Sequence, residues 1–125
     1  MYDPSSRGNR PIRNINELEY LDGVIYANIW YEDHIHQIDA ASGQVTATYD
    51  MSSLYPKQQR AADADCLNGI AFNSSDQTFL LTGKLWPHYH VVRFNSASSS
   101  GSGSSSTASS ANANVRINRR RDELK

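Results

Sequence analysis

The feature of this sequence that most constrains its fold is an internal repeat of about fifty residues. The first copy reads INELEYLDGVIYANIWYEDHIHQID, and the second reads LNGIAFNSSDQTFLLTGKLWPHYHVVRFN. Aligning the two copies by their letters matches Asn16 with Asn68, 52 residues further on, and Trp30 with Trp86, 56 residues further on. A chain built this way is expected to fold as two similar units rather than around one irregular core.

Both copies consist of short segments in which apolar and polar side chains alternate, the period of a β-strand. Asp22 and Gly23 form a two-residue hairpin signal between ELEYL and VIYANIW, and HIHQID and VTATYDM follow. The second copy gives LNGIAF, QTFLLTG and YHVVRF. Between the copies, residues 52–66 break the alternation and predict a long connection with a helical turn.

Repeats of three or four antiparallel strands are typical of the blades of a β-propeller. The sequence therefore predicts an all-β fold of two propeller blades. Two blades cannot close a ring, because each blade buries its faces against its neighbours. The chain is thus expected to be part of a larger propeller.

Composition divides the chain into three regions. Residues 96–114 are nearly all Ser, Ala, Gly, Thr and Asn, and such a tract has too few apolar side chains to offset the entropy of folding. We expect a polar N-terminal segment over 1–11, two blades over 12–95 and a disordered tail over 96–125, with a basic cluster near its end.

The charge and the cysteine content exclude several classes of function. A net charge of −1 gives no electrostatic footprint for nucleic acid or for a membrane surface. No apolar run approaches the length of a membrane span. Cys66 is the single cysteine, so no internal disulfide can form, and the compartment stays open.

Four stretches of the chain resemble the glutaminyl-peptide cyclotransferases of the plant and bacterial type: INELEYLDGVIYANIW, HQIDAASGQV, LNGIAF and LLTGKLWP, in the family's order and close to its spacing. Members of that family are five-bladed β-propellers that cyclise N-terminal glutamine to pyroglutamate and release ammonia. The resemblance covers roughly residues 12–95. It implies the last two of the five blades, peptide or protein substrates with N-terminal glutamine, and no metal or other cofactor.

The reaction requires the substrate's α-amine to attack its own γ-carboxamide. A general base must take a proton from the amine, and preorganised donors must stabilise the oxyanion that forms. By resemblance, Asn16 and Lys84 match the family's oxyanion-polarising pair, and Trp30 matches a tryptophan that lines the substrate pocket. Glu17 is predicted to bind substrate because it adjoins Asn16.

The family's acid/base glutamate lies in an earlier blade, and no part of this sequence matches that segment. We therefore expect these 125 residues to be inactive alone, with the missing blades supplied by further sequence or by a partner chain. Structural interpretations stay open beside the functional ones: Lys84 could be a solvated loop charge, Asn16 could bond a blade turn as Asn68 is expected to, and Trp30 could belong to the core between blades. Trp86 is expected to pack beneath its loop. At the level of function, the alternative is a non-catalytic binding module derived from a propeller.

The histidines raise the question of a metal site. HIH and HYH each place two imidazoles on one face of a strand, a spacing that zinc sites use. The letter alignment matches His34 with His90 and leaves His36 opposite Val92, so the two pairs are out of register. We predict no metal site on that ground.

Overall fold

The computed structural model describes residues 2–3, 10–94 and 113–116. The described residues form short strands and one turn of 3-10 helix. The strands are β1 (Tyr2–Asp3), β2 (Arg10–Pro11), β3 (Ile15–Leu21), β4 (Val24–Ile29), β5 (His34–Asp39), β6 (Val45–Asp50), β7 (Leu67–Asn73), β8 (Thr78–Gly83), β9 (His90–Phe94) and β10 (Ala113–Arg116), and the helical turn is η1 (Lys57–Gln59). The sequence predicted β3 to β9 and the helical turn, but not β1, β2 or β10.

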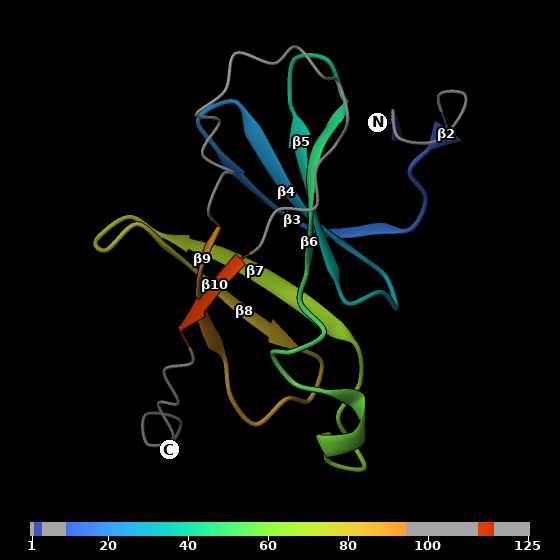
Figure 1. Ribbon diagram of the computed structural model, residues 1–125, viewed down its shortest axis with the longest axis vertical. Coiled ribbons are helices and arrows are strands. Elements are labelled where there is room, and N and C mark those ends of the chain that lie inside the picture. The colour runs from blue at the N-terminus through green and yellow to red at the C-terminus, as the bar shows by residue number, and fades with distance from the viewer. Residues whose placement is uncertain (1, 4–9, 95–112, 117–125) are drawn as a thin grey trace.

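The strands form two four-stranded antiparallel sheets and one short hairpin. The first sheet has the order β3-β4-β5-β6 and the second the order β10-β9-β8-β7, while β1 pairs with β2. Figure 1 shows the first sheet in blue to green and the second in yellow to red, joined by the connection that carries η1. In each sheet, strands that follow one another in the chain are antiparallel neighbours, the arrangement of a propeller blade.

The hairpins between the first two strands of each sheet differ in length. In the first sheet, Asp22 and Gly23 both have positive φ, 48° and 82°, which is the conformation of a tight two-residue hairpin turn. In the second sheet, four residues, 74–77, fill the same turn. Equivalent positions are therefore 52 residues apart before this turn and 54 apart after it.

The strand register corrects the alignment that the letters suggested. Ala27 pairs with His36 in the first sheet, and Leu81 pairs with His90 in the second. His90 is thus equivalent to His36, and its alignment with His34 was wrong. The letter alignment matched identical residues 56 positions apart, as in His34 and His90, whereas the strand pairing gives 54.

The larger of two apolar clusters in the described residues lies between the two sheets, and a smaller one is formed by Ala27, Ile38 and Val45. The centre of the larger cluster is aromatic: the ring of Phe79 lies 4.5 Å from Tyr26, 4.9 Å from Phe94 and 5.1 Å from Phe72, between centroids. Burial raises the pKa of the Tyr26 hydroxyl above its ordinary value. The buried members of the larger cluster are Ile35, Ala47, Tyr49, Met51, Leu54, Leu67, Ile70, Phe79, Leu81 and Val92.

Two side-chain hydrogen bonds join the sheets where β7 lies against β3 and β4. The Glu19 carboxylate accepts a hydrogen bond from the backbone N–H of Phe72 at 2.9 Å. The buried Asn28 amide oxygen accepts one from the N–H of Gly69 at 3.2 Å. Glu19 therefore has a structural role, since its carboxylate joins the two sheets.

The expectation of a disordered tail over 96–125 lies outside the described residues except at 113–116. There the chain forms β10, which pairs antiparallel with β9 and completes the second sheet. Composition gave no signal for this strand, because its first two residues, Ala113 and Asn114, belong to the serine-rich tract.

Candidate active site

Trp30 and Lys84 occupy equivalent positions in the two sheets, so the letter alignment of Trp30 with Trp86 was wrong. Each is the first residue after the second strand of its sheet. The Trp30 N–H donates to the carbonyl of Asn14 at 2.8 Å, and the Lys84 N–H donates to the carbonyl of Cys66 at 3.0 Å. Both acceptors immediately precede the first strand, so both residues leave their sheets at the same end.

The two residues also begin the same kind of turn. Tyr31 and Leu85, which follow them, both have positive φ, 65° and 60°. The turn after β4 is closed by a hydrogen bond of 3.0 Å from the N–H of Glu32 to the carbonyl of Ile29. The turn after β8 is closed by one of 3.2 Å from the N–H of Trp86 to the carbonyl of Gly83. Because the two turns match, the side chains of Trp30 and Lys84 project in corresponding directions from neighbouring blades.

This equivalence brings Trp30 and Lys84 together. The Lys84 Nζ lies 5.9 Å from the centroid of the Trp30 ring, within the range of a cation–π contact. The Tyr31 ring lies 4.5 Å from the Trp30 ring. All three side chains are exposed, so a ligand could reach an aromatic surface that carries one cation.

Asn16 and Glu17 lie at the start of β3, in a stretch where the pairing register shifts. Such a bulge frees side chains from strict alternation. Asn16 follows closely on Asn14, whose carbonyl holds Trp30, and both Asn16 and Glu17 are exposed. Within the described residues the structure therefore brings Trp30 and Lys84 into contact and leaves Asn16 and Glu17 open on the adjoining strand.

Tyr31 is a residue of this site that the sequence reasoning missed. It adjoins Trp30 in sequence, and the adjacent pair of aromatic residues after a predicted strand was the available signal. Tyr31 is 60% exposed, and the centroid of its ring lies 4.5 Å from that of Trp30. An exposed pair of rings is a surface suited to binding.

Trp86 packs beneath the loop that carries Lys84, as expected from the sequence. A side chain on Gly83 would collide with its ring, because a Cβ there would lie 2.2 Å from the Trp86 Cε2. The ring meets Tyr55 edge-on at 5.1 Å, and its Nε1 donates to the carbonyl of Asp65 at 2.7 Å. Trp86 therefore supports the loop rather than facing a ligand.

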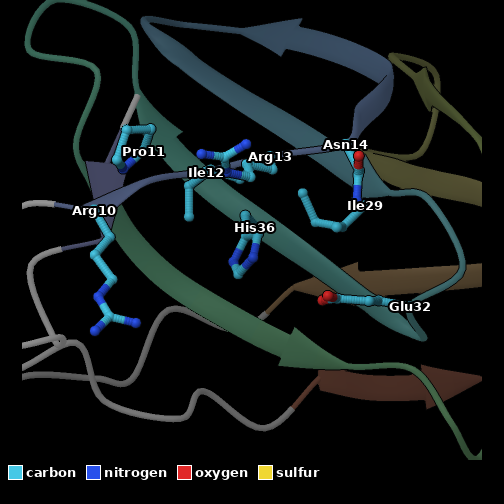
Figure 2. A pocket seen from close by; sticks show the side chains of 8 residues that line it. All are labelled: Arg10, Pro11, Ile12, Arg13, Asn14, Ile29, Glu32 and His36. Carbon is cyan, nitrogen blue, oxygen red and sulfur yellow. The ribbon is translucent and has the colours of Figure 1, made fainter.

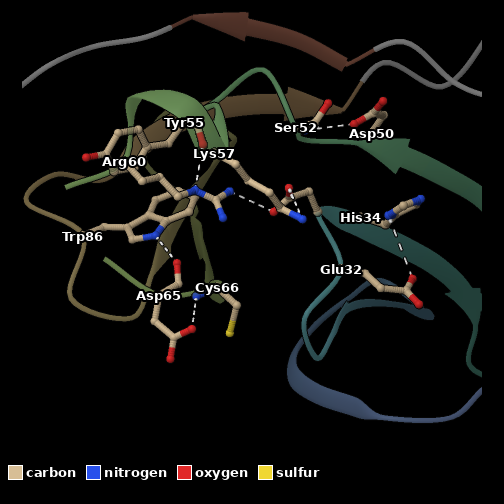
Figure 3. A network of polar contacts seen from close by, with 11 residues as sticks. Glu32, His34, Asp50, Ser52, Tyr55, Lys57, Arg60, Asp65, Cys66 and Trp86 are labelled. Carbon is tan, nitrogen blue, oxygen red and sulfur yellow. Dashed lines mark hydrogen bonds and ion pairs between the residues drawn. The ribbon is translucent and has the colours of Figure 1, made fainter. Parts of the chain in front are cut away.

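A network of polar contacts lies beside this support (Figure 3). The Arg60 guanidinium donates to the Asp33 carboxylate at 2.9 Å, and the Lys57 Nζ lies 4.0 Å from the other carboxylate oxygen. The Arg60 and Asp33 side chains are only 10% and 13% exposed, whereas Lys57 is 67% exposed. The network borders a hollow of about 300 Å³, lined by Tyr31, Asp33, Lys57, Arg60, Ala61, Ala64, Asp65 and Cys66.

A second hollow, of about 470 Å³, lies over the other face of the first sheet (Figure 2). The segment from Arg10 to Asn14 crosses this face above Ile29 and His36. Trp30 and Lys84 do not line it. The two hollows are thus on different sides of the turn that follows β4.

The histidines make local contacts. The His36 Nδ1 lies 2.8 Å from the Thr48 hydroxyl oxygen, and the rings of His88 and His90 are 4.6 Å apart. Across the described parts of the chain, no group of three or more His, Cys, Asp or Glu side chains could hold a metal ion. In the same parts, no helix has the length and apolarity that crossing a membrane requires.

Known proteins are similar to this chain in sequence and in fold. The sequence model of the family described as glutamine cyclotransferase matches residues 5–94. The glutaminyl-peptide cyclotransferase of Arabidopsis thaliana is 35% identical over 92 residues, which are 72% of this chain and 29% of that protein. The crystal structure of Myxococcus xanthus glutaminyl cyclase superposes with a TM-score of 0.59 at 41% identity, covering 67% of this chain and 37% of the Myxococcus chain.

The chain spans well under half the length of either relative. The family match nevertheless covers most of the chain, including strands β3 to β9 and the two equivalent turns. The resemblance that the sequence motifs suggested is confirmed, and with it the propeller type of fold. The chain belongs to the glutamine cyclotransferase family.

Proposed function

We propose that these residues form part of the active site of a glutaminyl-peptide cyclotransferase, which converts the N-terminal glutamine of peptides and proteins to pyroglutamate and releases ammonia. The observation that carries the proposal is the contact between Lys84 and Trp30, 5.9 Å apart on equivalent turns of two blades. It places a cation beside an aromatic wall at one end of both sheets.

Each residue of the site has a task that suits its chemistry. The ammonium of Lys84 stabilises the oxyanion that develops when the α-amine attacks the γ-carboxamide. The Asn16 amide offers a directed N–H to the same oxygen. The ring of Trp30 holds the short side chain in a folded shape close to that of attack. Glu17, beside Asn16, binds the substrate.

The proton transfers need a general base outside these residues. By family resemblance this is a glutamate of an earlier blade, and the chain spans 29% of the Arabidopsis relative. We propose that the 125 residues alone do not turn over substrate, and that the remaining blades come from further sequence or from a partner chain.

The test uses a hybrid enzyme: the full 125-residue chain joined to the part of the Myxococcus glutaminyl cyclase that the structural match does not cover. Loss of one oxyanion donor typically costs about 10²–10³ in rate. In the hybrid, Lys84→Ala should lower kcat by that order and change KM little, because the charge it stabilises exists only in the transition state.

Two further variants sharpen the test. Lys84→Arg keeps the charge but presents a planar fork in place of a compact ammonium, so kcat should fall with it too. Lys57→Ala removes the exposed lysine of η1, in the connection between the sheets, and should leave kcat unchanged. An active hybrid in which both Lys84 variants keep the wild-type kcat would show that Lys84 is an ordinary surface charge.

One observation favours the alternative of a non-catalytic binding module. Trp30, Tyr31 and Leu85 are 44%, 60% and 71% exposed, so the two turns present apolar surface to solvent. A hybrid that folds and binds a glutaminyl peptide through these side chains, yet releases no ammonia, would establish the binding module instead.

A further inference from the structure

We propose that Arg60 is a positioning residue that fixes the distance between Trp30 and Lys84. It does so by contacting both the turn after β4 and the loop after β8. The inference rests on the function proposed above. Trp30 and Lys84 project from different sheets, and both side chains are exposed. Their spacing therefore needs a support other than their own packing.

On the Trp30 side, Arg60 forms an ion pair with Asp33 at the end of the turn. Its guanidinium donates to the Asp33 carboxylate at 2.9 Å, and the Asp33 carbonyl accepts the N–H of Met51 at 2.8 Å. The two charged side chains are 10% and 13% exposed, so water and salt screen their attraction much less than that of a surface pair. The turn that begins at Trp30 is thus anchored three residues later.

On the Lys84 side, Arg60 acts through Trp86. The guanidinium carbon lies 5.0 Å from the centroid of the Trp86 ring, a cation–π contact. The Trp86 Nε1 donates to the Asp65 carbonyl at 2.7 Å, and the Asp65 N–H donates to the Lys84 carbonyl at 2.8 Å. A movement of the Trp86 ring is therefore transmitted to the backbone of Lys84.

A third contact fixes the guanidinium itself. The Arg60 Nε donates to the carbonyl of Tyr55 at 2.9 Å, and the Tyr55 hydroxyl accepts the N–H of Ala61 at 2.7 Å. Figure 3 shows Arg60 between Tyr55 and Trp86. One planar group thus uses its edge for Asp33 and Tyr55 and its face for Trp86, which a lysine cannot reproduce.

The consequence for catalysis is an effect on rate rather than on binding. A misplacement of about 1 Å at a reacting group can cost on the order of 10²-fold in rate. Because Lys84 acts on charge that appears only in the transition state, its displacement lowers kcat more than it raises KM.

The experiment uses Arg60→Met in the hybrid enzyme, with Lys57→Met as the matched control, since Lys57 also faces Asp33 but is 67% exposed. We expect Arg60→Met to lower kcat roughly 10–100-fold with a KM change below about 3-fold. Lys57→Met should match the parent. Because Arg60 acts in part through Lys84, the double variant R60M/K84A should lose less than the product of the two single losses.

A wild-type kcat in Arg60→Met, or losses that multiply in the double variant, overturns the proposal. Should Arg60→Met fail to fold, Arg60→Lys decides: it keeps the ion pair but loses the stacked face, so a kcat below that of the parent supports the proposal and a parental kcat refutes it.

A second readout separates this inference from the proposed function. The 125-residue chain has two tryptophans, Trp30 and Trp86, so its proton NMR spectrum contains two indole N–H resonances. Arg60→Met should shift both resonances, and Lys57→Met should shift neither. An unmoved Trp30 resonance overturns the positioning role, even if the hybrid is active. If Arg60→Met shifts both resonances but Lys84→Ala keeps the wild-type kcat in an active hybrid, the proposed function is wrong. The structural role of Arg60 between the two turns would then still hold.

Discussion

Gly83→Ala tests the packing that supports the candidate site. The Cβ of an alanine there would lie 2.2 Å from the Trp86 Cε2 and 2.3 Å from its Nε1, far inside van der Waals contact. The Gly83 backbone is not in the left-handed region, so alanine itself is compatible with the strand. The whole cost of the substitution should therefore come from displacing the Trp86 ring.

The magnitude follows from the contacts that the ring would lose. The hydrogen bond to Asp65 contributes about 0.5–1.5 kcal/mol. The edge-on contact with Tyr55 contributes about 0.5–1.5 kcal/mol and the cation–π contact with Arg60 about 0.5–1 kcal/mol. Alanine recovers about 0.5–1 kcal/mol, because it restricts the unfolded chain more than glycine does. A net destabilisation of about 2 kcal/mol is expected.

The assay is urea denaturation of Gly83→Ala, Trp86→Ala and the double variant, in dilute chain. If the ring is the obstacle, Gly83→Ala should be nearly neutral in the Trp86→Ala background, with a coupling energy of about 2 kcal/mol. Gly23→Ala is the control: its Cβ would meet nothing within 4 Å, so its cost comes from φ +82° and does not depend on Trp86. Equal destabilisation by Gly83→Ala in both backgrounds would refute the reasoning.

Two other predictions concern the chain as a whole and one of its carboxylates. The described sheets expose Leu18 and Tyr20 on β3, and a blade normally covers such a face with its neighbour, so the 125-residue chain should self-associate. A single monomeric species across a wide concentration range in sedimentation velocity would contradict this. The Ser52 side chain, followed by its backbone N–H, holds the pKa of Asp50 below its ordinary value. The resulting stabilisation is present above the ordinary pKa and is lost as the pH falls through the lowered one. Ser52→Ala should raise the Asp50 pKa toward its ordinary value in a carboxyl NMR titration, while the pKa of Asp39, lowered mainly by the Ser42 side chain, should stay unchanged.

The strands could be predicted from the sequence because each is short, alternating and bounded by a turn signal. The hairpin at Asp22 and Gly23 was predicted from its turn signal, and the helical turn within 52–66 from the loss of alternation there. Strand β10 could not be predicted, since its partner β9 lies across the serine-rich tract and pairing over that separation leaves no local pattern. Local periodicity therefore predicted the elements but not every neighbour.

The candidate site was predicted in part. Lys84 and Trp30 followed from the family resemblance, and the structure shows them in contact. Their equivalence was hidden, because the letter alignment matched Trp30 with Trp86. The true correspondence depends on a hairpin turn two residues longer in the second blade, and this length is read from cross-strand pairs rather than from letters.

The two equivalent turns also explain how one repeat can supply different chemistry from each blade. The backbone of the turn is set by its closing hydrogen bond and by the bond to the residue before the first strand, and neither bond uses the side chain at Trp30 or Lys84. Both side chains are exposed, so exchanging an indole for an ammonium there costs the fold little. The following residues, Tyr31 and Leu85, are neither glycine nor asparagine, yet both adopt positive φ, a conformation that costs an ordinary residue about 1 kcal/mol or more. A turn that keeps this strain in both blades, while varying the residue in front of it, is built to present side chains rather than to stabilise the sheet.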